Sequence, residues 1–396
     1  MNSKTKPRFR KDPAASEDLI IKKLTKKSKR AKILGVFFSC FSGLAVICTV
    51  LFSLFIYSSI PFFSYWRGIW VETAMTTMNH RWLATAFIPG YQIDKIMGET
   101  INPDIIGGAN ALVTTSPVIS DTLPAETEPP APTDHDPLKQ KELNVGDKDY
   151  AGNTVLINDI EEGIIVSEIS RGSFKGKIML IDDPSRVYVG STPYPGEKGL
   201  RIRAMMDHYG AIAGINASGF IDPQESGHGG EIVGLSCSMG NFWGEYAPYY
   251  GSIVLTNDNK LVVGNISVWQ GYNIRDGIQF GPVLIADGEA QVKGSAGYGL
   301  HPRTAIGQRE DGVIAFLVID GRDVTHSIGC TVGDLAKILL EYGIVNAACC
   351  DGGASSVLAY NGEVITKNCS LNPAYGRPLP NAFLVRSKND IKNTQS

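Results

Sequence analysis

The chain has 396 residues, a formal net charge of -3 and 43% hydrophobic residues. This composition is that of a globular protein long enough for two or three domains with a sizeable core. Charge is distributed unevenly, because residues 1–32 hold 12 Lys or Arg against 3 Asp or Glu and the rest of the chain is acidic. A basic block is compatible with nucleic-acid binding. The uncharged stretch directly after it argues against that, so we predict no nucleic-acid partner.

Residues 33–60 contain no charged side chain and follow Lys32 directly. A bilayer core requires about 20 apolar helical residues, so this stretch can span it with some tilt. Positive flanks remain in the cytoplasm. We therefore predict a single-pass protein of the cell membrane, with residues 1–32 cytoplasmic, a transmembrane helix at 33–60 and everything beyond it extracytoplasmic. The alternative is a cleaved signal peptide, whose apolar region of about 7–15 residues would be shorter.

Residues 61–112 form a juxtamembrane segment with Trp and Tyr residues suited to a membrane interface. The stretch Ile69–Phe87 fits an interfacial helix, and it equally fits a segment that packs on the domain or on a partner. Residues 113–139 are rich in Pro and Thr and predict an extended linker that holds the next domain away from the bilayer.

Residues 140–388 have the pattern of a globular domain, followed by a tail at 389–396. We predict helices at Leu200–Tyr209 and Val332–Tyr342; Thr331 and Asp334 precede the second at capping-box spacing. Short β-rich runs with Gly or Asn-Asp turns make up most of the rest, so the fold class is α+β, a mixed β-rich domain with two main helices. The predicted strands include Lys177–Asp182, Arg186–Gly190, Ser252–Thr256, Lys260–Gly264, Val283–Ala286, Ala305–Gln308, Val313–Asp320, Ala347–Cys350, Ser356–Tyr360 and Ala382–Arg386.

Polar residues cluster where these strands begin or end. Asn216 lies in the turn Gly214–Phe220 and offers both donor and acceptor atoms. Arg303 and Thr304 open a strand after a stiffening Pro302, and a guanidinium suits a carboxylate or phosphate. Taken singly, an Asx-turn explains the asparagine and a surface position explains the arginine.

Two acidic residues follow apolar strands. Asp320 precedes Gly321 and Arg322, which allows either a simple ion pair or a base beside a phosphate clamp. Asp351 precedes two glycines, which permit close approach of backbone N–H groups to a ligand, or form a plain turn. The preceding pair Cys349-Cys350 is apolar, and we predict that both thiols are buried.

Together these groups suit an anionic substrate and acid–base chemistry. The sequence contains no P-loop, GxGxxG, HExxH or GxSxG motif. The histidines lack metal-ligand spacing, and His228, in the Gly-rich loop 226–230, is a candidate substrate contact.

The ordered set of Asn216–Phe220, Pro302–Thr304, Asp320–Arg322, the helix at 332–342 and Asp351–Gly353 resembles the phosphodiester glycosidase family. This is the N-acetylglucosamine-1-phosphodiester α-N-acetylglucosaminidase-like domain, also described in bacterial exopolysaccharide-biosynthesis-type proteins. The resemblance covers about residues 170–388. The family turn often reads Asn-Gly-Gly-Phe-Phe, whereas Ala217 and Ser218 depart from it here, which puts the shape of the sugar pocket in question.

The resemblance implies an α+β fold and a hydrolase that cleaves sugar-1-phosphodiester bonds in a phosphorylated glycan or glycolipid. It implies catalytic roles for Asp351, as base or nucleophile, and for Asp320. A divalent cation between the acids and the phosphate is compatible with oxygen ligands, but its ligands are unknown. The alternatives are a non-catalytic glycan-binding or assembly module of the cell envelope and a glycan transferase. The implied substrate-binding residues are Asn216, Arg303, Thr304, Arg322, Gly352, Gly353, Ser355 and Arg377, to which the Gly-rich loop adds His228 as a candidate.

Overall fold

The structure is a computed structural model that describes residues 13–77, 80–98, 106–108, 143–223, 227–267, 269 and 272–390. The chain divides into two compact units, residues 1–67 and 68–396. The predicted linker at 113–139 and most of the predicted tail lie outside the described residues.

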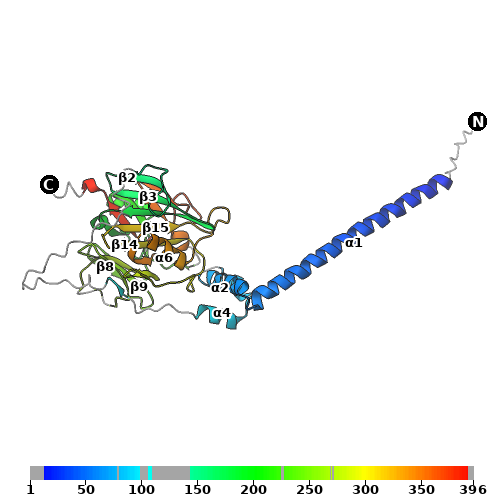
Figure 1. The fold of residues 1–396 in the computed structure, drawn as a ribbon, viewed down its shortest axis with the longest axis horizontal. Helices are drawn as coiled ribbons and strands as arrows, with labels where there is room; N and C mark the ends of the chain where they lie inside the picture. The colour runs from blue at the N-terminus through cyan, green and yellow to red at the C-terminus, as the bar shows by residue number, and fades with distance from the viewer. Residues whose placement is uncertain are drawn as a thin grey trace, which may run out of the picture. The chain divides into compact units, whose positions relative to one another are not determined.

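The first unit contains the long helix α1 (Pro13–Tyr57) (Figure 1). Within its described residues, Thr25–Tyr57 is long and apolar enough to cross a membrane, a criterion that a signal sequence near the N-terminus also meets. The helix ends at Tyr57, and Arg67 then returns to it: Nη1 donates to the carbonyls of Phe55, Ile56 and Ser58 at 2.9–3.0 Å. These bonds satisfy carbonyls that a helix end leaves without an intrahelical partner.

A helical segment leads into the second unit. It comprises α2 (Pro61–Met75), which crosses the unit boundary, α3 (Trp82–Thr85) and α4 (Gly90–Met97). The stretch Ile69–Phe87 is therefore not one helix. Its apolar residues Ile69, Val71, Ala74 and Ala84 are buried, and α2 forms hydrogen bonds with residues 300–301. Of the alternatives predicted for this segment, the structure supports packing on the domain.

Three antiparallel sheets build the rest of the second unit (Figure 1). A six-stranded sheet has the order β1-β10-β9-β11-β7-β8, an eight-stranded sheet the order β13-β12-β16-β14-β15-β4-β3-β2, and a five-stranded sheet the order β18-β17-β6-β19-β5. The strands are β1 (Ile106–Gly107), β2 (Thr154–Asp159), β3 (Ile164–Arg171), β4 (Phe174–Ile181), β5 (Val187–Ser191), β6 (Ala211–Asn216), β7 (Leu235–Ser238), β8 (Asn241–Gly244), β9 (Gly251–Thr256), β10 (Leu261–Gly264), β11 (Ile274–Phe280), β12 (Val283–Ala286), β13 (Glu289–Ala290), β14 (Arg303–Arg309), β15 (Ile314–Ile319), β16 (Ile344–Cys349), β17 (Leu358–Tyr360), β18 (Glu363–Val364) and β19 (Asn381–Arg386).

Strand β15 shows why the run Val313–Asp320 is almost wholly apolar. Ile314, Phe316 and Val318 point into a core shared by all three sheets, while Ala315 and Leu317 point into a second core beneath helix α6. Because successive side chains alternate between faces, a strand buried on both sides needs an apolar residue at every position. Every residue of β15 is buried.

Two helices cover the sheets, as predicted. Helix α5 (Ile202–Tyr209) packs on the five-stranded sheet and α6 (Val332–Glu341) on the eight-stranded sheet. The capping box of Thr331 and Asp334 is present with both of its hydrogen bonds, so local sequence defines where α6 begins. The fold is mixed and β-rich, which confirms the coarse class. Two 3-10 turns, Pro184–Arg186 and Gly353–Ser355, complete the described elements from residue 143 onward.

The register of the eight-stranded sheet brings the polar strand ends together. Strand β14 lies between β15 and β16 and is antiparallel to both, with Arg303 opposite Ile319 and Ala305 opposite Cys349. The start of β14 therefore lies beside the ends of β15 and β16. Arg303, Asp320 and Asp351 consequently lie on the same side of the sheet, where these strands start or end.

Candidate active site

Asn216 anchors the turn that carries Asp351. Its Nδ2 donates to the Asp351 carbonyl at 2.7 Å, and its Oδ1 accepts from Thr304 Oγ1 at 2.7 Å and from Val357 N at 3.1 Å. Asn216 and Thr304 are both 0% exposed. Their polar groups are used within the protein, so these predicted substrate contacts act in the structure as positioning residues.

The Asp351 carboxylate remains half-buried beside these anchors. Its Oδ1 accepts the Gly352 N–H at 2.9 Å. Burial raises the pKa of Asp351 to about 6, opposed by hydrogen bonds from Ser355 and the Gly352 N–H and by the charge of Arg377. The negative charge of Asp222 adds to the increase. A carboxyl group with this pKa can exchange a proton near neutral pH.

Arg377 links a second acid to the Asp351 carboxylate. Its Nη2 pairs with the buried Asp222 Oδ2, and its guanidinium lies 4.8 Å from the centre of the Phe220 ring. Asp222 was not predicted as a site residue. The signal available in the sequence was its position two residues beyond the Asn216–Phe220 turn. We call Asn216, Asp222, Thr304, Asp351, Ser355 and Arg377 the Asp351 cluster.

An aromatic pair borders this cluster. Phe280 lies against Gly219 of the turn that follows Asn216, where an added Cβ would be 2.7 Å from its ring, and burial followed by the charge of Asp351 raises the pKa of the Tyr250 hydroxyl. Tyr250 stacks on Phe280 with ring centres 5.1 Å apart and planes 14° apart. The stacked rings present flat apolar faces next to an acid.

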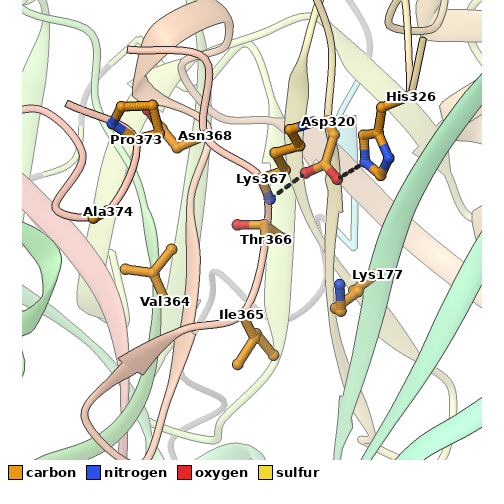
Figure 2. Close-up of a pocket in the computed structure, with 10 residues that line it drawn as sticks. All are labelled: Lys177, Asp320, His326, Val364, Ile365, Thr366, Lys367, Asn368, Pro373 and Ala374. Atoms are coloured by element: carbon orange, nitrogen blue, oxygen red, sulfur yellow. Dashed lines mark hydrogen bonds and ion pairs between the residues drawn. The ribbon is translucent and has the colours of Figure 1, made fainter. Parts of the chain in front are cut away.

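Asp320 lies in different surroundings, at a pocket of about 420 Å³. Figure 2 shows Asp320 and His326 together on one side of this pocket, with Val364, Pro373 and Ala374 across from them. We call this the Asp320 pocket; Lys177, Ile365, Thr366, Lys367 and Asn368 complete its lining.

The Asp320 carboxylate is only 4% exposed and both of its oxygens have protein partners. Oδ2 bonds to His326 Nε2 at 2.8 Å, and Oδ1 accepts the Lys367 N–H at 2.9 Å. Burial raises the pKa of Asp320, opposed first by the His326 hydrogen bond and then by the charge of Lys177. His326 was not a predicted site residue, although it follows Asp320 by only six positions.

The two predicted arginines have different environments. Arg303 is buried, and its Nη2 donates to the carbonyls of Tyr298 at 2.7 Å and Gly299 at 2.9 Å. Arg322 is exposed and lies beside Gly353, where an added Cβ would come within 3.2 Å of Arg322 Nη2. Of the two guanidinium groups, that of Arg322 is therefore the exposed one, and that of Arg303 is bonded to backbone carbonyls.

The backbone N–H groups of Gly352 and Gly353 are bonded within the protein. The Gly352 N–H donates to Asp351 Oδ1, and the Gly353 N–H donates to the Pro302 carbonyl at 2.9 Å. Gly353 has a φ of +61°, which an L side chain rarely adopts. These two residues therefore shape the turn, and their N–H groups are occupied.

Neither group of residues includes His228. Its side chain is exposed, and its carbonyl accepts from Gly199 N at 2.7 Å, which fastens the loop. Within the described residues, no three His, Cys, Asp or Glu side chains gather as a metal site.

The Asp351 cluster and the Asp320 pocket adjoin each other. Asn368, in the pocket lining, donates to the carbonyls of Ala354 at 3.0 Å and Ser356 at 2.8 Å, in the turn that follows Asp351. Arg322, two residues beyond Asp320, reaches Gly353 of the same turn. The two regions are therefore directly connected.

Comparison with known proteins shows a family match within this domain. Residues 209–386 match the family model described as phosphodiester glycosidase. This segment holds Asp320, Asp351 and all their neighbours named above except Lys177, so the predicted resemblance is confirmed for this part of the chain.

Individual relatives are more distant. The SPbeta prophage-derived uncharacterized protein YomE of Bacillus subtilis (strain 168) is 33% identical over 196 residues, which is 46% of this chain. The chain spans only 29% of the length of that relative. The catalytic domain of zebrafish N-acetylglucosamine-1-phosphodiester alpha-N-acetylglucosaminidase, auto-inhibited by its pro-peptide, is 19% identical with a TM-score of 0.47, covering 57% of this chain and 82% of that one. A hypothetical protein from Synechocystis is 17% identical with a TM-score of 0.43, covering 59% and 64%.

Proposed function

We propose that the domain hydrolyses a sugar-1-phosphodiester and that Asp351 is its central catalytic residue. The observation that supports this most directly is a half-buried carboxylate whose pKa burial raises to about 6, inside the family-matched segment. The Asp320 pocket and the exposed Arg322 adjoin it. In our proposal, the sugar, the phosphate and the second phosphate substituent each bind to a separate part of this arrangement.

In the proposed reaction, the sugar ring packs against Tyr250 and Phe280, and its phosphate binds Arg322. A water molecule attacks the anomeric carbon as the bond from this carbon to the phosphate oxygen breaks. Asp351 accepts the proton of the attacking water, and the phosphate leaves as a monoester anion paired with Arg322. The transition state is oxocarbenium-like, and the nearby carboxylates stabilise its positive charge. A route with Asp351 as nucleophile uses the same contacts.

Phosphate is a good leaving group, so strong acid catalysis is not required. The Asp320–His326 pair then acts on the phosphate side, where His326 offers a proton or hydrogen bond to the departing oxygen. Lys177 and Lys367 line the same pocket and suit a polar or anionic second substituent.

The non-catalytic alternative predicts that the polar residues are far apart or buried as ion pairs. Asp320 is partnered by His326 and Arg303 by carbonyl groups, which resembles that expectation. Asp351 and Arg322 stay accessible, which favours catalysis.

We further propose that residues 33–60 anchor the chain in the cell membrane, with the N-terminus in the cytoplasm and the domain outside. The support is the apolar stretch Thr25–Tyr57 and the basic residues before it. An enzyme in this location would meet envelope polymers, exopolysaccharides or lipid-linked glycans. Labelling of single cysteines placed at residues 10 and 389 with a membrane-impermeant reagent tests the orientation; equal labelling of both contradicts it.

The activity is tested with the full chain in detergent micelles and a panel of sugar-1-phosphodiesters. We expect release of free sugar and a phosphomonoester, with no release by the Asp351→Asn variant. Tight binding without turnover would instead identify a glycan-binding module. Appearance of a new glycoside when an alcohol or phosphate acceptor is added would identify a transferase.

A further inference from the structure

The loop that precedes β14 touches both of the turns that carry the proposed catalytic acids. The Pro302 carbonyl accepts the Gly353 N–H at 2.9 Å, next to Asp351. On its other side, the Pro302 ring lies against Gly321, next to Asp320, where an added Cβ would be 2.8 Å from the ring. No side chain fits at Gly321. Pro302 therefore lies between the two turns and contacts both of them.

The residues directly before Pro302 are bonded to helix α2 and to the turn that follows it. The Leu300 N–H donates to Thr73 Oγ1 at 2.9 Å, and His301 Nε2 bonds to Thr76 Oγ1 at 2.8 Å. Gly299 has a φ of +61°, and an added Cβ there would lie 2.5 Å from the Thr73 backbone. The approach of helix to loop is therefore close enough to exclude any side chain at residue 299.

The rest of the loop is fastened equally firmly. His301 exchanges two backbone hydrogen bonds with Cys330, at 3.3 and 3.0 Å. Burial, followed by the charges of Arg303 and Arg322, lowers the pKa of His301 to about 3, so its ring is neutral at ordinary pH. A neutral ring with a fixed partner at Nε2 gives the loop one orientation. Thr73, in α2, and Thr76, just after it, provide the contacts between this loop and the helix.

We propose that Thr73 and Thr76 are positioning residues for the active site, which hold Leu300 and His301 so that Pro302 stays wedged between the Asp320 and Asp351 turns. In this proposal, helix α2 is part of the catalytic unit, although it lies outside residues 209–386 and some 220 residues before the loop in sequence. The effect on turnover rests on the proposed function; the effect on the turns does not.

The test uses the full chain in detergent micelles and the double variant Thr73→Val/Thr76→Val, which removes both hydroxyl groups and keeps the branched shape. Thr77→Val is the matched control, because Thr77 follows α2 directly after Thr76 and its Oγ1 donates back to the Ala74 carbonyl of the helix at 2.8 Å. The double variant Thr73→Ser/Thr76→Ser keeps both hydroxyls and should behave as the parent does. If the double Val variant does not fold, Thr76→Val alone removes the His301 contact and the bond from Thr76 Oγ1 to the Glu72 carbonyl, and it leaves the Thr73 contact in place.

Hydrogen exchange of individual amides gives the decisive readout. We expect faster exchange of the Leu300 amide, which loses its acceptor, and about tenfold faster exchange of the Gly353 amide, which can respond only if Pro302 shifts. The proposal is overturned if Leu300 responds and Gly353 does not, because the effect then ends at the loop.

Turnover of a sugar-1-phosphodiester gives the second readout. We expect kcat to fall about 10- to 100-fold, since misplacement of reacting groups by an ångström costs about that much, with KM little changed and Thr77→Val at the parent level. A rise in turnover also overturns the proposal, since α2 would then obstruct the site. If the parent shows no turnover but Gly353 responds, the positioning role stands and the proposed function fails.

Discussion

Asp320 and Asp351 follow the two strands that flank β14, yet their surroundings differ. Asp320 is 4% exposed, and both of its oxygens bond to protein groups, one of them the His326 ring. Asp351 is half-buried, and its carboxylate bonds to the adjacent Gly352 amide and to Ser355. Burial raises the pKa of both. This difference supports our proposal that Asp351 meets the substrate directly, whereas Asp320 acts together with His326 at the neighbouring pocket.

The largest expected effect is that of Asp351→Asn. Because the amide cannot accept a proton or attack carbon, we expect kcat/KM for a sugar-1-phosphodiester to fall about 1,000-fold or more. The fold should be retained, as judged by circular dichroism. Asp311→Asn is the control, since the Asp311 side chain is 45% exposed in the β14–β15 turn, where it pairs with Arg309 and accepts the Val313 N–H. Equal activity of the two variants would remove Asp351 from the mechanism.

A smaller loss is expected for the Asp320–His326 pair. Asp320→Asn and His326→Gln should each lower kcat/KM about 10- to 100-fold, at the low end of the general range for acid–base groups, because phosphate leaves readily. If the two residues act as one unit, the double variant should lose little more than either single variant. Additive losses would show that each acts independently.

Arg322→Ala should mainly weaken substrate binding. Loss of a hydrogen bond to a charged group costs about 1.5–3 kcal/mol, so we expect KM to rise about 10- to 100-fold with a smaller change in kcat. Arg203→Ala is the matched control, because Arg203 is also exposed but lies on α5. A change confined to kcat would place Arg322 at the transition state instead of the bound phosphate.

The pH profile distinguishes a base from an acid at Asp351. A base must be ionised, so kcat/KM should rise about tenfold per pH unit below 6 and level off above the raised pKa of about 6. If Asp351 were the general acid, activity would fall above pH 6. Measurement between pH 4 and 8 on a sugar-1-phosphodiester, whose diester group stays ionised throughout this range, separates these outcomes.

The smallest effect concerns stability. A carboxyl group with a folded pKa near 6 and an unfolded pKa of about 3.9 binds more protons in the folded state between these values. Its contribution to the free energy of unfolding is therefore fully present below about pH 4 and is lost as the pH rises through 6. Asp351→Asn should accordingly raise Tm by a few degrees at pH 7.5 and by less at pH 4. A lower Tm at pH 7.5 would show that the ionised carboxylate stabilises the fold.

Local sequence was sufficient for several elements. The capping box at Thr331 and Asp334 determined the start of α6, because both hydrogen bonds lie within one helical turn. The apolar run of β15 and the buried thiols of Cys349 and Cys350 followed from hydrophobicity alone. Strand β11 was not predicted, since Asp276 interrupts its pattern. That buried acid is tolerated because its Oδ1 accepts the N–H groups of Val189 and Met239, which come from distant parts of the chain.

For the site, the sequence by itself determined that acids, arginines and glycines stand at strand ends, because the apolar runs of the neighbouring strands stop at these residues. The antiparallel placement of β14 between β15 and β16 decided that these strand ends lie side by side. Tertiary structure also decided which side chains are exposed: the Arg303 guanidinium is hydrogen-bonded to backbone carbonyls, whereas Arg322 is exposed. The same holds for Asp222, His326 and Thr76. Their contacts join chain segments whose proximity depends on how the sheets and α2 pack, which no local pattern encodes.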